Sequence, residues 1–363
     1  MLTRSVRGPR TVIDRARRAR WFEPSALITG VGIAAILTGA AWAGETYKLG
    51  HGYDIGPINL AGYANVTLSM PNEGQKALTF EDFSLFATGH FSKLINPFIE
   101  AELTHVVIAH SSPSDDREPD AAFTFERYYN DAYITPEVTL RLGKMLAPVG
   151  EWNLIHAAPL VLTTTRPAVT YRNFSAYITG VSMLYSDPES QRPDVQIYWQ
   201  PDREESEKPR AITFENHRRA EGIHLSLPLS LLDKVGASYQ HSVDPDDVTQ
   251  SLFGVDYHLT LGKTALQGEA TYSTLSGGTV PRARNTEWGG YLAASYTFDH
   301  HWSASTWYEA FLKRDENTPA QDLLFGLAYH PQSAMVIKLE YVQNIGGAPV
   351  NPTGIFASWS ILF

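Results

Sequence analysis

The last nine residues of the chain decide the fold class. They read Ile355-Phe356-Ala357-Ser358-Trp359-Ser360-Ile361-Leu362-Phe363. The odd positions are apolar, whereas Ser358 and Ser360 occupy the other parity, and the chain ends on a phenylalanine. Successive side chains of a β-strand point to opposite faces of the sheet, so this pattern predicts a strand with one apolar and one polar face.

The same period of two recurs along the chain from about residue 56 onward. Strands of soluble sandwiches usually run about five or six residues, whereas a strand of a membrane barrel needs about 9–11. Most of the alternating segments have membrane length. We predict sixteen of them, at about 56–70, 78–91, 95–108, 123–135, 138–146, 175–186, 193–200, 219–228, 234–243, 250–261, 263–275, 286–298, 302–313, 321–331, 334–344 and 353–363.

The connections between these segments alternate between short turns and longer polar loops. Two short hairpins, 71–77 and 244–249, interrupt an otherwise regular contrast. An even number of strands with short turns at one end and long loops at the other is typical of bacterial outer-membrane barrels. The sequence therefore predicts an all-β fold, a transmembrane antiparallel up-and-down β-barrel of about 16 strands in the bacterial outer membrane, with both termini in the periplasm.

The first 43 residues differ in charge from the rest. They hold seven arginines, Asp14 and Glu23, followed by an apolar run at 26–37 and the small-residue pattern Ala41-Trp42-Ala43. This order predicts a secretory signal peptide with a long basic n-region, cleaved after residue 43. The alternative is a single membrane anchor, because residues 26–43 approach the minimum spanning length. The barrel is expected to occupy 44–363.

Composition excludes several classes of protein. The 363 residues carry a net charge of −10 and only 19% charged residues, and no cysteine is present. A disulfide scaffold, a thiolate metal site and a thiol nucleophile are therefore excluded. Without the signal peptide, 22 basic and 37 acidic residues remain, a net charge of −15 that argues against nucleic-acid binding. Neither a cofactor nor a metal-ligand pattern is evident.

The segment Leu140–His156 reads Leu-Arg-Leu-Gly-Lys-Met-Leu-Ala-Pro-Val-Gly-Glu-Trp-Asn-Leu-Ile-His. It resembles the R-x-G-K-F-x-x-P-F-G-x-W-N-x-x-H stretch of porin-like proteins related to the phosphate-selective porins O and P, with Met145 and Val149 in place of two phenylalanines. The C-terminal strand is similar to the signature that the barrel assembly machinery recognises in outer-membrane proteins, which implies a contact through Phe363. These resemblances imply an outer-membrane porin and no enzyme.

The motif opens the longest connection, residues 146–174. Prolines and Gly150 prevent this connection from continuing a ladder, and the run Leu154–Leu162 is too apolar for a free surface loop. We expect it to fold into the barrel and narrow the pore; the alternative is a lid packed over the barrel mouth. The constriction residues would be Trp152, Asn153, His156 and Arg166.

Residues of the parity opposite to the apolar positions should line the lumen. Acidic residues outnumber basic ones in this set, which predicts a mild cation preference. The alternative is that the carboxylates pair with Arg127, Arg141 and Lys338 to satisfy a polar interior. Lys144 shares the parity of Leu142 and its side is left open. The predicted pore-lining residues are Glu100, Glu102, Arg127, Asp131, Arg141, Asp256, His258, Glu269, Glu309, Lys338 and Glu340.

The predicted function is passive diffusion of small hydrophilic solutes or ions. Two other functions are known for outer-membrane barrels. A structural sheath around a partner protein needs a wider barrel, generally above about twenty strands. A lipid-active enzyme could use His224-x-Ser226, but the flanking Ile223 and Leu225 turn this pair away from lipid. The expected partners are outer-membrane lipid, lipopolysaccharide and further copies of the chain in a homotrimer.

Overall fold

The computed structural model describes residues 47–111, 121–155, 157–187, 192–202, 217–279 and 281–363. The chain divides into two units, 1–45 and 46–363, and all described residues belong to the second. The predicted signal peptide, 1–43, lies outside the described residues. No helix among the described residues is long and apolar enough to cross a membrane.

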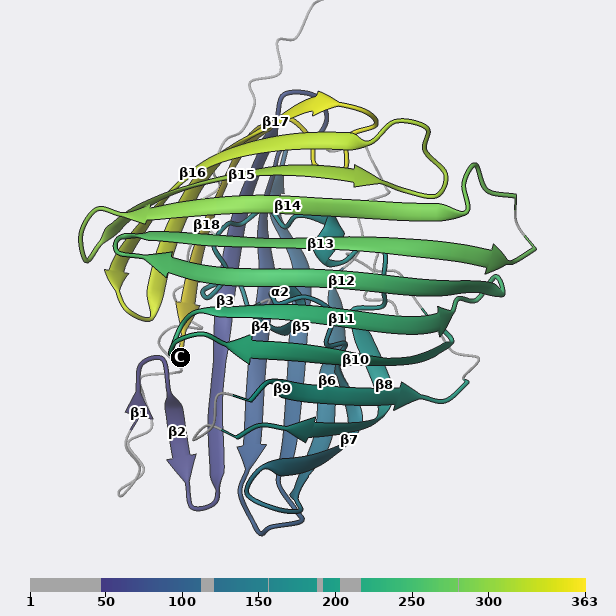
Figure 1. Ribbon diagram of the computed structural model, residues 1–363. Coiled ribbons are helices and arrows are strands. Elements are labelled where there is room, and N and C mark those ends of the chain that lie inside the picture. The colour runs from purple at the N-terminus through teal and green to yellow at the C-terminus, as the bar shows by residue number, and fades with distance from the viewer. Residues whose placement is uncertain (1–46, 112–120, 156, 188–191, 203–216, 280) are drawn as a thin grey trace, which may run out of the picture. The chain divides into compact units, whose positions relative to one another are not determined.

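Among the described residues, sixteen strands close into one antiparallel barrel (Figure 1). This confirms the predicted all-β barrel. The barrel strands are β3 Ile58–Pro71, β4 Ala77–Gly89, β5 Pro97–His110, β6 Ala122–Tyr133, β7 Val138–Leu146, β8 Tyr177–Tyr185, β9 Asp194–Gln200, β10 Arg219–Pro228, β11 Lys234–Val243, β12 Val248–Leu261, β13 Thr264–Gly277, β14 Thr286–Thr297, β15 Trp302–Leu312, β16 Ala320–Gln332, β17 Met335–Gly346 and β18 Gly354–Leu362.

Each strand pairs with its neighbour in the sequence, and the C-terminal strand closes the ring. β18 runs antiparallel to β3 from the Gly354–Pro71 pair to the Leu362–Tyr63 pair. Phe363 continues the ladder, since its main chain both donates to and accepts from Gly62. Closure leaves no free edge, which is the condition for a sheet to lie in lipid.

The alternation predicted from the sequence sets the two faces of the wall. Large apolar side chains such as Phe253, Val255, Leu292 and Leu339 are exposed on the outside of the barrel. Their neighbours of opposite parity, such as Leu252 and Asp256, are buried in the interior. A lipid-facing surface needs apolar side chains on every strand, and this requirement fixes the register of the whole sheet.

A short hairpin precedes the barrel and was not predicted from the sequence. It consists of β1 Tyr47–Lys48 and β2 Gly52–Ile55. β2 pairs with the first residues of β3, from the Tyr53–Leu60 pair to the Ile55–Ile58 pair. It lies at the end of the barrel where the C-terminus also lies (Figure 1). We call this the turn end and the opposite end, where β7 joins β8, the loop end.

Candidate functional site

The longest connection joins β7 to β8 and comprises residues 147–176, here called the inner loop; residue 156 is not described. Its two ends meet, because the Ala147 N–H donates to the Ala176 carbonyl over 2.9 Å. The Asn153 side chain donates to the carbonyls of Ala147 and Ala176, over 2.9 and 3.0 Å. It also accepts a hydrogen bond from Arg166 over 3.0 Å. The predicted constriction residues Asn153 and Arg166 thus tie the loop together.

Three buried glutamates of the barrel wall hold the inner loop by its main chain. Glu269 of β13 accepts from the N–H groups of Glu151 and Trp152, over 3.1 and 2.6 Å. Glu309 of β15 accepts from Val169 over 2.8 Å, and Glu340 of β17 accepts from Thr164 and from Thr165, the latter over 3.0 Å. Since β7 and β8 lie across the ring from β15 and β17, the loop traverses the barrel interior (Figure 1).

A lysine completes this set of anchors. Lys338 lies two residues before Glu340 on β17, on the same face of the strand. It donates to the carbonyls of Ala158 and Val161 over 2.8 and 2.6 Å. An unpaired main-chain group in a buried position costs about 1–3 kcal/mol. The four anchors satisfy loop N–H and C=O groups that have no ladder partner, and this defines the path of the loop.

Gly150 explains one part of the motif that the sequence singled out. Its φ is +68°, and a Cβ placed there would lie 2.0 Å from a carboxylate oxygen of Glu269. Only glycine allows the main chain to approach Glu269 this closely in this conformation. The next residue but one, Trp152, packs edge-on against Tyr291 with ring centroids 5.9 Å apart.

Apolar side chains pack together in the part of the interior beside β14–β17. Trp152, Ala168 and Val169 of the loop pack with inward-facing Trp307 and Leu324 of the wall. A second cluster joins loop and wall beside β7–β12; its members are Met145, Ala147, Val149, Phe174, Ile178, Tyr198, Ala220 and Leu252. Such packing excludes water. The larger cavity of the interior lies on the other side of the loop.

A cavity of about 310 Å³ lies on that other side, between the inner loop and strands β3–β6, β17 and β18. Trp152 and Arg166 line it from the loop, and Lys338 lines it from β17. Four carboxylates line it from adjacent strands of the wall: Glu81, Asp82, Glu102 and Glu126. A smaller cavity of about 90 Å³ lies beside His258 and Glu269.

The four carboxylates accept hydrogen bonds from neighbouring wall residues. Glu102 accepts from Tyr63 over 3.2 Å and from Ser84 over 3.0 Å. Asn65 donates to Asp82 and Thr67 to Glu81, each over 3.4 Å, and Tyr177 donates to Glu126. We call Glu81, Asp82, Glu102 and Glu126 the acidic wall. Only Glu102 of these four was among the predicted pore-lining residues.

The other predicted lumen residues lie in pairs or beside the loop. Arg127 pairs with Glu100, and Arg141 forms two hydrogen bonds with Asp131 over 2.7 and 2.8 Å. Asp256 is buried, with an oxygen 4.0 Å from His224. His156 lies outside the described residues. The structure thus brings Glu102, Trp152, Arg166 and Lys338 together at one cavity, whereas the other described residues of the predicted set lie outside its lining.

The structure gives the surroundings of Lys144, whose side the sequence left open, and of His224, which was predicted to face away from lipid. Lys144 is buried, donates to the Phe125 carbonyl over 3.0 Å and lies 5.1 Å from the Tyr177 ring. His224 faces inward, 2.9 Å from the Ser238 hydroxyl, while the lipid-facing position next to it belongs to Leu225. The described residues contain no group of three His, Cys, Asp or Glu that could hold a metal ion.

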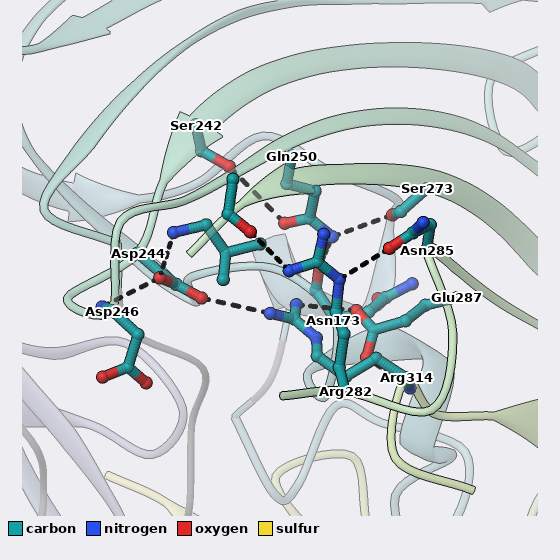
Figure 2. Close-up of polar contacts among 12 residues, drawn as sticks. Asn173, Ser242, Asp244, Asp246, Gln250, Ser273, Arg282, Asn285, Glu287 and Arg314 are labelled. Atoms are coloured by element: carbon teal, nitrogen blue, oxygen red, sulfur yellow. Dashed lines mark hydrogen bonds and ion pairs between the residues drawn. The ribbon is translucent and has the colours of Figure 1, made fainter. Parts of the chain in front are cut away.

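A second cluster of charged and polar residues connects the hairpins between β11 and β16 at the loop end of the barrel (Figure 2). Arg314 pairs with Glu287 over 2.8 Å and with Asp244 over 3.1 Å, and these side chains are nearly buried. Gln250 donates to the main chain of Asn173 in the inner loop and to Ser273 of β13, each over 2.8 Å. This cluster joins three hairpins to the base of the inner loop.

His217 lies beside this cluster and makes the protein sensitive to acid. Burial, reinforced by the nearby Arg314 guanidinium, lowers the pKa of His217 to about 4. Between pH 6.5 and 4 the unfolded chain therefore binds a proton that the folded chain excludes. Lowering the pH from 7.5 to 4.5 is expected to reduce the free energy of unfolding by about 2–3 kcal/mol through this group.

Urea unfolding of the barrel in detergent micelles, followed by tryptophan fluorescence at both pH values, measures this loss. His217→Asn should show a smaller acid-induced decrease than the native chain. His300→Asn is the matched control, since it removes an exposed imidazole at the turn end, far from the cluster. An equal pH dependence in the native chain and in His217→Asn would contradict the prediction.

Comparisons with solved structures give the class of fold. The chain is similar to a loop-deletion mutant of the outer-membrane protein OmpT of Vibrio cholerae, with a TM-score of 0.62 and 13% identity over 85% of this chain and all of that one. It is similar to OmpF of Salmonella typhi in complex with daunomycin, with a TM-score of 0.62 and 13% identity over 88% of this chain and 99% of that one.

An anion-selective porin from Comamonas acidovorans matches with a TM-score of 0.56 and 13% identity, over 84% of this chain and 98% of that one. The fold is that of the outer-membrane porins. At this identity the likeness concerns the fold alone. No family model matches the chain, and a search of curated proteins finds no match either.

Proposed function

We propose that the protein is an outer-membrane porin that lets small hydrophilic solutes or ions diffuse passively, with a mild preference for cations. The observation that carries this proposal is the cavity between the inner loop and the wall of a closed sixteen-stranded barrel. Barrels of this size enclose an aqueous channel when their interior is not filled. The excess of carboxylates along this cavity favours cations over anions.

The alternatives have less support. A sheath around a partner protein requires a wide lumen, whereas here the inner loop and its apolar clusters fill much of a sixteen-stranded barrel. A lipid-active enzyme requires catalytic groups on the outer surface, and His224 is buried in the interior. We therefore propose no enzymatic activity.

The proposed setting follows from the same fold. We place the turn end, which holds both the β1–β2 hairpin and Phe363, in the periplasm, and the predicted signal peptide 1–43 would direct export. Lipid and lipopolysaccharide would surround the wall, the assembly machinery would bind the strand ending in Phe363, and three copies would associate; one OmpT structure is described as a trimer form. We also propose, from the segment Leu140–His156, that the chain is related to the phosphate-selective porins O and P.

Planar-bilayer recording tests the function. The purified, refolded protein should insert as discrete conductance steps in 1 M potassium chloride, and a tenfold salt gradient should give a reversal potential of the sign that cation preference requires. A folded protein that inserts without forming conducting channels would contradict the porin proposal. A reversal potential of anion-selective sign would contradict the cation preference alone.

A further inference from the structure

The lumen carboxylates fall into two groups with different surroundings. Glu269, Glu309 and Glu340 are each hydrogen-bonded to main-chain N–H groups of the inner loop. These three carboxylates therefore serve to hold the inner loop in place. The acidic wall instead lines the 310 Å³ cavity, and side chains of the barrel wall donate hydrogen bonds to it.

Backbone irregularities concentrate the acidic wall in one place. The register of β4 shifts between the Asn65–Asp82 and Val66–Phe80 pairs, which leaves Glu81 as an extra residue. The register of β6 shifts between the Glu100–Arg127 and Ala101–Phe125 pairs, which leaves Glu126 as another. A β-bulge of this kind breaks the alternation, so two consecutive side chains can face the same way. Glu81 and Asp82 both line the cavity as a result.

β5 carries a third irregularity between these two. His105 has a φ of +57°, which is rare for a residue other than glycine. Its imidazole lies 3.5 Å from Glu81. Three adjacent strands thus depart from regular geometry at the level of the acidic wall, and strained backbone of this kind is characteristic of functional positions.

The opposite side of the cavity has a different chemistry. It presents the hydroxyl and methyl groups of Thr163, Thr164 and Thr165, together with the apolar side chains of Trp152, Val161 and Phe356. The two cations on the cavity are engaged: Lys338 binds loop carbonyls and Arg166 binds Asn153 and Thr170. A solute between the two sides would meet carboxylates on one flank and an aromatic, apolar surface on the other.

We propose that Glu81, Asp82 and Glu126 determine the selectivity of the pore and that the solutes it selects are small organic ammonium ions. The proposal rests on the porin function proposed above and names its solute class. The ammonium group lies against the acidic wall, while the hydrocarbon part contacts Trp152 and Phe356 on the other flank. An indole ring also attracts an ammonium group directly.

Size and coordination favour an organic cation over a chelated metal ion. A volume of about 310 Å³ is at the lower end of small-molecule pockets, which span about 300–1,000 Å³. Within the described parts of the chain, no three carboxylate or imidazole side chains converge closely enough to hold a metal ion. The wall therefore attracts cations over an extended surface and does not trap them, as conduction requires.

Bilayer recordings with two cations test the proposal. In a tenfold gradient of potassium chloride, Glu81→Gln/Asp82→Asn/Glu126→Gln should lower the permeability ratio of potassium to chloride about tenfold, the lower end of the enrichment that a charged cleft produces. With potassium chloride on one side and n-butylammonium chloride on the other, the native pore should pass butylammonium at least as well as potassium. The triple variant should lose this preference.

The matched control removes three carboxylates from exposed loop-end positions, as Glu73→Gln/Asp246→Asn/Glu316→Gln. It should leave both permeability ratios unchanged. Heat-modifiable migration on gels reports folding, and Glu81→Gln/Asp82→Asn serves where the triple variant does not fold, since Glu126 is the most enclosed of the three.

The outcomes separate this proposal from the porin function. The role of the acidic wall would be overturned if the native pore and the folded variants of Glu81, Asp82 and Glu126 had equal permeability ratios and intact conductance. The porin function would stand in that case. A native pore that conducts potassium but excludes butylammonium would overturn the solute class. A folded native protein without conductance would overturn the porin function itself.

Discussion

Replacement of residues 152–168 by a short Gly-Ser linker is expected to increase single-channel conductance several-fold. These residues supply the loop side of the 310 Å³ cavity and the apolar cluster around Trp152. Without them, the interior beside β13–β17 opens to water, and a sixteen-stranded barrel without an inner loop encloses a wide aqueous channel. Conductance steps in 1 M potassium chloride measure the change.

The deletion also tests where the loop lies. A lid over the barrel mouth would leave the width of the lumen unchanged, and the conductance of a folded deletion variant would then equal that of the native pore. Glu309→Gln/Glu340→Gln offers a milder form of the same experiment, because it weakens the anchors of Thr164, Thr165 and Val169 without removing the loop. We expect it to increase current noise and to raise the mean conductance less.

Arg314→Met is expected to reduce the free energy of unfolding by about 3–5 kcal/mol, the cost of breaking a buried ion pair. Arg314 is the partner of both Glu287, which is fully buried, and Asp244 (Figure 2). Without the guanidinium, two carboxylates remain in a poorly hydrated environment. Urea or heat unfolding of the refolded barrel in detergent measures the loss.

Arg282→Met is the matched control in the same cluster. Arg282 donates to Asn285 and to the Gly277 carbonyl near the surface, so its loss should cost about 0.5–1.5 kcal/mol. Adding Glu287→Gln to Arg314→Met should recover part of the stability, since it removes one of the uncompensated charges. Equal losses in the two single variants would show that the ion pairs of Arg314 contribute little.

Much of the barrel could be predicted because lipid imposes a strict rule on each strand. The alternation ending at Phe363 and the segments with the same period correspond to β3–β18 with small differences at their ends. The β1–β2 hairpin escaped prediction because strands of two and four residues are too short to show a period.

The candidate site was predicted only in part. Trp152, Asn153 and Arg166 were identified by their motif and by the length of the connection, but the placement of Trp152 depends on Glu269, a residue more than a hundred positions away in the chain. Glu81 and Glu126 were missed because parity counting assumes an unbroken alternation. Two successive charged residues inside an alternating segment, Glu81-Asp82 in one strand and Glu126-Arg127 in another, were local signs of the bulges.

By itself the sequence determined an antiparallel barrel, the number of its strands and the face that each regular strand position presents. These depend on local periodicity, which the contrast between lipid and lumen enforces residue by residue. Only the tertiary structure decided which carboxylates hold the inner loop and which face the open cavity. That division depends on the path of the loop across the lumen and on bulges in β4 and β6, where contacts between distant residues outweigh the local pattern.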